Sequence, residues 1–149
     1  MNEMSYSNMM FRNVVYKEYV NFNIYELDTC AKDFYKLISE QNLKKNGPLI
    51  MAYTQIMKEN MVNIELMLPV NKPLTSNENL NFRTYLCIDE MLHGRMIGED
   101  YENQEKKVLT EIERFSKENN LKRISPYYHI INEVEGLKWI DIKVKVLEL

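Results

Sequence analysis

What this chain of 149 residues lacks excludes several classes of protein. Its 19 basic and 22 acidic residues are interspersed and give a net charge of −3, so it has no strongly basic face of the kind that binds nucleic acid. Its apolar runs are far too short to span a bilayer, and the N-terminus shows no signal-peptide pattern. These absences predict a cytoplasmic protein without nucleic-acid or membrane partners.

Residues for metal or catalytic chemistry are also scarce. The two cysteines, Cys30 and Cys87, stand far apart in unlike contexts, which fits neither a disulfide framework nor a zinc site. The two histidines, His93 and His129, have no second metal ligand at a useful spacing. No Ser-His-Asp or Cys-His arrangement has supporting motifs. The sequence therefore predicts no metal, no cofactor and no enzymatic activity.

What the chain does contain is a repeated pattern of apolar positions. Gly47-Pro48 returns as Ser125-Pro126, an offset of 126 − 48 = 78. Two alternating apolar runs coincide at the same offset, Val62, Ile64, Leu66, Leu68 and Ile140, Ile142, Val144, Val146. The repeat predicts a single domain, 1–149, with repeat one at about 12–70, a linker rich in Asn, Pro and Ser at 71–81, and repeat two at about 82–149.

Within repeat one, the periodicity predicts the order β-α-β-β. β-Branched and aromatic residues predict a strand at 13–23. Asp28 is expected to cap a helix that runs to about Gln41 and ends before Gly47-Pro48. Alternating segments predict strands at 49–57 and 61–70, joined by a turn at Asn60.

Repeat two is predicted to have the same order. A strand at 82–97 is either continuous or interrupted near 89–90 or at Gly94, and a helix follows at 101–120. Strands at 124–134 and 137–147 are joined by a turn at 135–136. The predicted fold is α+β, a tandem β-α-β-β repeat forming an antiparallel sheet with two helices on one face. Its predicted core is Phe34, Leu37, Ile64, Leu66, Val108, Ile112, Phe115, Ile142 and Val144.

Side chains alternate across a strand, so the residues between the core positions should face away from the helices. In the last strand these are Trp139, Asp141, Lys143 and Lys145, and in repeat one they include Glu65. A Trp ring among charges either packs over the sheet edge or offers a platform to a partner.

The segment 124–131 (ISPYYHII) resembles the Pro-x-Tyr-Glu-Ile-Tyr strand of the gyrase-inhibitory-protein-like small-molecule-binding domains. Residues 88–102 (IDEMLHGRMIGEDYE) resemble that family's strand leading through a loop into its second helix. Members also serve as effector-binding domains of multidrug-response activators, and one branch of the fold binds haem. The resemblance implies a ligand cleft where strands of the two repeats approach each other.

The chain departs from this family at the residue that matters most for charge. In the family a buried Glu attracts cationic aromatic drugs, and some relatives use it with a Tyr to hydrolyse small electrophiles. Here His129 takes the place of that Glu, and Ile131 takes the place of the following Tyr. A neutral imidazole carries no fixed negative charge, which argues against both activities. The chain also has no helix-turn-helix segment, so by itself it is not expected to be a DNA-binding regulator.

The offset of 78 places Met51 opposite His129, since 129 − 78 = 51, which predicts an aromatic hollow between the repeats. Its predicted lining is Tyr19, Met51, Tyr53, Glu65, Tyr127, His129 and Trp139. The alternative for His129 is a core histidine hydrogen-bonded to a tyrosine. The leading function is a stand-alone domain that senses or sequesters a small aromatic molecule. The alternative is a protein-interaction module (an adaptor, chaperone or inhibitor) that binds a partner protein through exposed Tyr, Met and Trp side chains.

Overall fold

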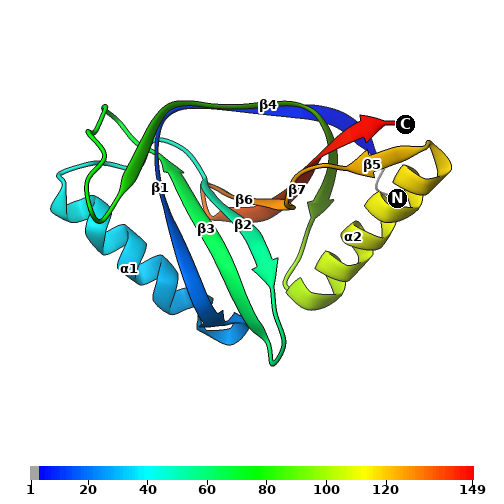
Figure 1. Ribbon diagram of the computed structural model, residues 1–149, viewed down its shortest axis with the longest axis horizontal. Coiled ribbons are helices and arrows are strands. Elements are labelled where there is room, and N and C mark those ends of the chain that lie inside the picture. Colours follow the sequence, from blue (N-terminus) through cyan, green and yellow to red (C-terminus); the bar gives the residue numbers. More distant parts are fainter. Residues whose placement is uncertain (1–3) are drawn as a thin grey trace. The chain divides into compact units, whose positions relative to one another are not determined.

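The computed structural model describes residues 4–149, which form seven strands and two α-helices (Figure 1). All strand pairs with a defined register are antiparallel. The predicted α+β class, with antiparallel strands and two helices, is confirmed. Neither helix in the described part of the chain is long and apolar enough to cross a membrane.

The described chain divides into two compact units, each with its own helix. The N-terminal unit is Met10–Leu86, and the C-terminal unit comprises Cys87–Leu149 together with the residues up to Met9. Two long strands, β1 (Ser5–Asn23) and β4 (Asn81–Met96), contribute to both units. The division therefore falls inside β4, beyond the predicted linker, and the tandem repeat itself stays a prediction.

In the N-terminal unit, β1 is followed by a 3₁₀ turn (Ile24–Glu26), α1 (Leu27–Glu40), β2 (Leu49–Ile56) and β3 (Met61–Pro69). β3 pairs with both β1 and β2. The prediction that Asp28 caps the helix is wrong, because Asp28 lies in the first turn and makes no cap. The capping residue is Asn23, which precedes the 3₁₀ turn and whose side chain accepts a hydrogen bond from the backbone N–H of Tyr25.

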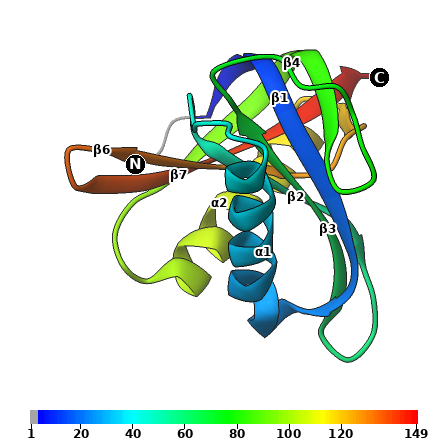
Figure 2. The same cartoon turned by 90° about the vertical axis from the view of Figure 1, so that its left-hand side faces the viewer.

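Helix α1 lies along one side of the strands of its unit (Figure 2) and buries Cys30, Phe34 and Ile38. These three residues are spaced four apart, so they form one stripe along the helix. Leu37, which was predicted to be core, is only partly buried because Ile38 takes the central position. The other predicted core residues of this unit, Ile64 and Leu66, are buried.

The C-terminal unit continues through α2 (Tyr101–Glu118), β5 (Leu121–Arg123), β6 (Tyr128–Val134) and β7 (Leu137–Glu148). β7 pairs with β4, β5 and β6. The strand predicted at 124–134 begins only at Tyr128, as β6, and the short strand β5 before it, at Leu121–Arg123, was not predicted; Ser125 and Pro126 lie between the two. β4 is continuous through Gly94, although Glu90 adopts a left-handed φ of 54°.

Helix α2 packs on the β7 side chains predicted to be core. The buried cluster is Leu92, Met96, Val108, Ile112, Ile142, Val144 and Val146. Phe115, predicted to be core, is only partly buried and packs against the margin of this cluster. Gly94 allows the close approach of α2, because a Cβ at this position would overlap Val108 Cγ1. The helix therefore covers one face of β4, β6 and β7, and the other face carries the polar residues described next.

Candidate ligand-binding site

The face of the C-terminal unit that points away from α2 carries a cluster of polar side chains around Asp141. The antiparallel register places Arg95 of β4 beside Asp141 of β7, and Asn132 of β6 beside Trp139. Two residues further along the same two strands, His93 of β4 lies beside Lys143 of β7. These six residues, Asp141, Arg95, Asn132, Trp139, His93 and Lys143, are called the Asp141 face below.

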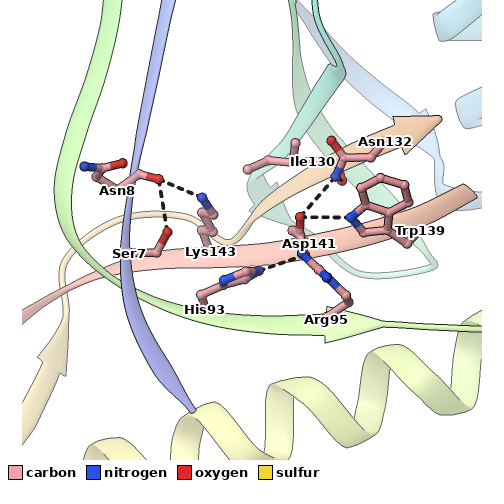
Figure 3. Close-up of polar contacts among 9 residues, drawn as sticks. All are labelled: Ser7, Asn8, His93, Arg95, Ile130, Asn132, Trp139, Asp141 and Lys143. Carbon is pink, nitrogen blue, oxygen red and sulfur yellow. Dashed lines mark hydrogen bonds and ion pairs between the residues drawn. The ribbon is translucent and has the colours of Figure 1, made fainter. Parts of the chain in front are cut away.

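Four side chains converge on the Asp141 carboxylate (Figure 3). Oδ1 accepts hydrogen bonds from His93 Nε2 at 2.7 Å and Arg95 Nε at 2.8 Å. Oδ2 accepts from Asn132 Nδ2 at 3.1 Å and Trp139 Nε1 at 3.2 Å. Donors from three strands thus meet at one acidic group, which fixes their side chains relative to one another.

Asp141 is only 8% exposed, yet it remains ionised. Burial raises the pKa of its carboxyl, but the hydrogen bonds and charges of His93 and Arg95 outweigh this and lower the pKa to about 2. The carboxylate is therefore a permanent anion at neutral pH, held by donors that keep it charged.

Trp139 and Arg95 give this face its aromatic and its cationic surface. The Arg95 guanidinium carbon lies 5.6 Å from the centre of the Trp139 ring, within the range of a cation–π contact. The Arg95 side chain is 48% exposed and Trp139 is partly exposed, so both can be reached from outside the fold. The indole and the guanidinium are therefore adjacent and partly exposed on this face.

Lys143 adds a second basic group two residues along β7. Its Nζ donates to the backbone carbonyl of Asn8 at 2.6 Å, which directs the ammonium along this face (Figure 3). Burial lowers the pKa of the Lys143 ammonium, Asp141 opposes this shift, and Arg95 adds to it. Lys143 is thus tied electrostatically to the Asp141 cluster.

His129, predicted to line the hollow, lies on the opposite face of the same strands. It pairs with Ile142, whose side chain packs against α2, and its Nε2 donates to Glu105 Oε2 of that helix at 3.0 Å. This hydrogen bond, partly offset by burial, lowers the pKa of Glu105. His129 is 1% exposed and is therefore a core histidine that hydrogen-bonds to a glutamate.

Tyr127 packs against the buried cluster below α2, with the Arg123 guanidinium carbon 4.8 Å from its ring centre. It therefore accompanies His129 and not Trp139. The C-terminal unit does not bring its three predicted site residues onto one face, because Trp139 alone belongs to the Asp141 face.

The four predicted site residues of the N-terminal unit also divide between two faces. Tyr19, Met51 and Tyr53 align with Ile64 and Leu66 in the register, on the side of α1. Tyr19 donates its hydroxyl to Asp33 Oδ2 of that helix at 2.6 Å. Glu65 points the other way. The predicted hollow would join residues of both units, and it stays a prediction.

The sequence reasoning missed His93, Arg95 and Asn132 as site residues. A signal for two of them was present, since His93 and Arg95 are two apart in one strand and must share a face. Asp141 and Lys143 were placed on the outer face without a role. Among the described residues, no group of three or more His, Cys, Asp and Glu side chains could hold a metal ion.

Each unit also contains a hollow of its own. The hollow of the C-terminal unit measures about 660 Å³ and is lined by Tyr6, Ser7, Asn8, Asp89, Glu90, Leu121, Val146 and Glu148. The hollow of the N-terminal unit measures about 480 Å³ and is lined by Lys17, Glu18, Tyr19, Val20, Phe22, Thr29, Cys30 and Asp33. Neither contains Trp139, so both are separate from the Asp141 face.

Solved structures share this fold. The chain is similar to EcmrR in a cryo-EM structure of an EcmrR–DNA complex, with a TM-score of 0.79 and 9% identity over 99% of this chain. It spans 58% of that EcmrR chain. It also matches the crystal structure of the EcmrR C-terminal domain, with a TM-score of 0.74 and 8% identity over 100% of this chain and 99% of that domain.

Two further structures match with a TM-score of 0.54 and 10% identity. One is SAV2435 bound to tetraphenylphosphonium, where the match covers 96% of this chain and 94% of SAV2435. The other is a hydrolase from Listeria innocua, where the match covers 95% of this chain and 90% of the hydrolase. At these identities the likeness shows the fold alone, and that fold agrees with the gyrase-inhibitory-protein-like resemblance.

No curated protein matches the chain. A protein-family match covers residues 10–148, nearly the whole sequence. The chain therefore belongs to the family described as a domain of unknown function, DUF5085.

Proposed function

We propose that this chain is a small-molecule-binding domain that holds a flat aromatic group against Trp139 on the Asp141 face. The observation that carries the proposal is the nearly buried Asp141 carboxylate, which fixes Trp139 and Arg95 while leaving both partly exposed. Side chains fixed before a ligand arrives lose little conformational freedom on binding, so binding costs less free energy.

The fold supports this proposal. SAV2435 has the same fold and was solved with tetraphenylphosphonium, a small aromatic molecule. EcmrR has the same fold in a structure with DNA, and this chain spans 58% of it. We infer that this domain senses or sequesters its ligand, and its interspersed charges with a net charge of −3 argue against direct binding of nucleic acid. A cytoplasmic location belongs to the same proposal, and the free thiols of Cys30 and Cys87 support it.

We also propose that binding occurs without turnover. Asp141, the carboxylate at the centre of the face, accepts four hydrogen bonds and has a pKa of about 2. A general acid or base works best when its pKa lies near the working pH. Asp141 is thus suited to position its neighbours and not to transfer protons.

The test uses the fact that Trp139 is the single tryptophan of the chain. A panel of flat aromatic compounds is titrated while the indole emission is recorded, and each hit is measured again by calorimetry. We expect a saturable emission change and a loss of about tenfold in affinity for Trp139→Leu, because the stacking surface is removed. Tyr25→Leu, at an exposed residue of the N-terminal unit, is the control and should bind as the wild type does.

Two outcomes would contradict the proposal. Binding that is the same in Trp139→Leu would place the ligand elsewhere. The absence of binding by any compound would favour the alternative of a protein-interaction module, whose exposed apolar side chains in the C-terminal unit include Tyr6, Ile124 and Leu147.

A further inference from the structure

We propose, on the basis of the function proposed above, that the ligand carries a negative charge beside its aromatic ring. Arg95 would bind that charge directly, with Lys143 as the second basic group and Asp141 as a positioning residue. An aromatic carboxylate is the simplest compound of this class.

The first argument concerns the hydrogen-bonding capacity of Asp141. A carboxylate has about four lone-pair sites, and Asp141 already accepts four hydrogen bonds, two on each oxygen. A cationic ligand could reach this carboxylate only by displacing one of the donors. The carboxylate is therefore available for holding its own neighbours and not for capturing an organic cation.

The second argument is the local balance of charge. The Arg95 guanidinium compensates the single negative charge of Asp141, since Arg stays protonated in proteins. Lys143 then adds a further basic group to the same face. Lys145, the next basic residue along this face, forms an ion pair with Asp89 at 2.8 Å. Among the six residues of the Asp141 face, two basic side chains, Arg95 and Lys143, thus accompany one acidic side chain, Asp141.

Two acidic side chains of β6 and β7 lie away from Trp139. Glu133 is opposite Lys138 in the register and points to the other side of the strands from Trp139. Glu148, which lines the hollow of this unit, is seven residues from Asp141 along β7, about 23 Å for an extended strand. These charges are too distant or wrongly directed to oppose an anion held beside Trp139.

The third argument is the geometry of Arg95. Its Nε holds Asp141 at 2.8 Å, its guanidinium carbon lies 5.6 Å from the centre of the Trp139 ring, and half of its side chain is exposed. A guanidinium is planar and presents its N–H groups as a fork that matches a carboxylate. A ring stacked on Trp139 would bring a carboxylate at its edge to this fork.

The experiment compares three probes that share one ring system: 2-naphthoate, 2-naphthamide and 2-naphthylmethylammonium. Calorimetry at neutral pH measures each against wild type, Arg95→Gln, Arg95→Lys and Lys143→Gln. We expect naphthoate to bind at least about tenfold more tightly than naphthamide, with the ammonium weakest. Arg95→Gln should remove most of the naphthoate advantage and leave naphthamide nearly unchanged, whereas Arg95→Lys should retain part of it. Lys143→Gln should have a smaller effect of the same kind.

The control is Arg123→Gln. Arg123 lies in the same unit and stacks on Tyr127 in a similar way, but on the side of α2, so its loss should alter no affinity. Thermal unfolding of each variant verifies that it is folded. Equal affinities for naphthoate and naphthamide would overturn the inference and leave the proposed function standing, as would tightest binding of the ammonium. If none of the probes bound, the inference and the proposed function would both fall.

Discussion

Each unit places an acidic side chain on the face that points away from its own helix, and the two acids behave in opposite ways. Asp141 of the C-terminal unit receives four hydrogen bonds, and its pKa falls to about 2. Glu65 of the N-terminal unit lies opposite Glu18 in the register. Burial raises the pKa of Glu65, Arg83 opposes the shift, and the charge of Glu18 adds to it.

The comparison shows that burial alone does not decide whether a carboxyl stays charged. Burial raises the pKa of both acids, and the sign of the net shift depends on the donors around each. A face on which a buried acid is held charged by surrounding donors is a prepared polar site. The outer face of the N-terminal unit, with two acids opposite each other and one nearby arginine, is less well prepared to bind a ligand. For this reason we place the ligand in the C-terminal unit.

A second difference lies on the helix sides. The N-terminal unit links its strand to α1 through the Tyr19 hydroxyl and Asp33, and the C-terminal unit links its strand to α2 through His129 and Glu105. Burial and Asp33 together raise the pKa of Tyr19 far above its ordinary value. The first link therefore keeps its proton throughout the accessible pH range.

The largest expected effect contrasts the two helix phenylalanines. Phe34→Ala should lower the free energy of unfolding by about 3–5 kcal/mol, because Phe34 is fully buried and its removal leaves a cavity. Phe115→Ala should cost clearly less, roughly 1–3 kcal/mol, because Phe115 is partly exposed. Urea unfolding followed by circular dichroism measures both. Equal losses would mean that the two helices are equally packed.

The next effect concerns the tight approach of α2 to its strands. Gly94→Ala should destabilise the protein by about 1–3 kcal/mol, because the new Cβ would overlap the Val108 side chain. In the double variant Gly94→Ala, Val108→Ala the loss should be smaller than the sum of the two single losses. Gly136→Ala is a control for added volume, since a Cβ there meets nothing within 4 Å, although its φ of +83° adds backbone strain. If the loss in the double variant equalled the sum of the two single losses, the close contact between Val108 of α2 and Gly94 would be refuted.

The comparison of Asp141 with Glu65 predicts opposite pH dependences. The pKa of Asp141 is lower in the folded state than its ordinary 3.8, so its stabilisation is present above that value and is lost as pH falls through about 2. The free energy of unfolding of the wild type should exceed that of Asp141→Asn by about 2 kcal/mol at pH 6, and this difference should shrink on acidification.

For Glu65 the sign reverses. Its pKa is raised in the folded state, so its ionisation opposes folding. The stability of Glu65→Gln relative to wild type should therefore increase as pH rises above the ordinary value of 4.5. Chemical unfolding from pH 2 to pH 8 measures both variants. Parallel profiles for the two variants would refute the contrast between the units.

The smallest effect is expected at the Tyr19 link. Tyr19→Phe removes one hydrogen bond and leaves Asp33 able to meet water, since about half of the Asp33 side chain is exposed. The cost should be about 1 kcal/mol and should not vary between pH 6 and pH 9. Thermal unfolding at several pH values measures it. A loss that changes over this range would show that the link titrates.

Local patterns in the sequence predicted most of the fold. The alternation of Ile140, Ile142, Val144 and Val146 identified β7 and its buried side, and the spacing of Val108 and Ile112 identified α2. Such patterns arise from the geometry of a single element, so they need no knowledge of its partners. The same alternation placed Trp139 and Asp141 on the outer face. The sequence was less informative at the ends of elements. The predicted cap at Asp28 was wrong, because the helix is preceded by a 3₁₀ turn that Asn23 caps.

Only the tertiary structure decided which side chains meet. Asp141 lies 46 residues from Arg95 and 48 from His93, and the register of β4 against β7 alone brings them together. A shift of that register by one residue would direct both side chains to the helix side, and no local pattern encodes it. The sequence by itself thus determined which residues could form a polar face. The pairing of distant strands decided that Asp141 would be its centre and that His129 would lie on the other side.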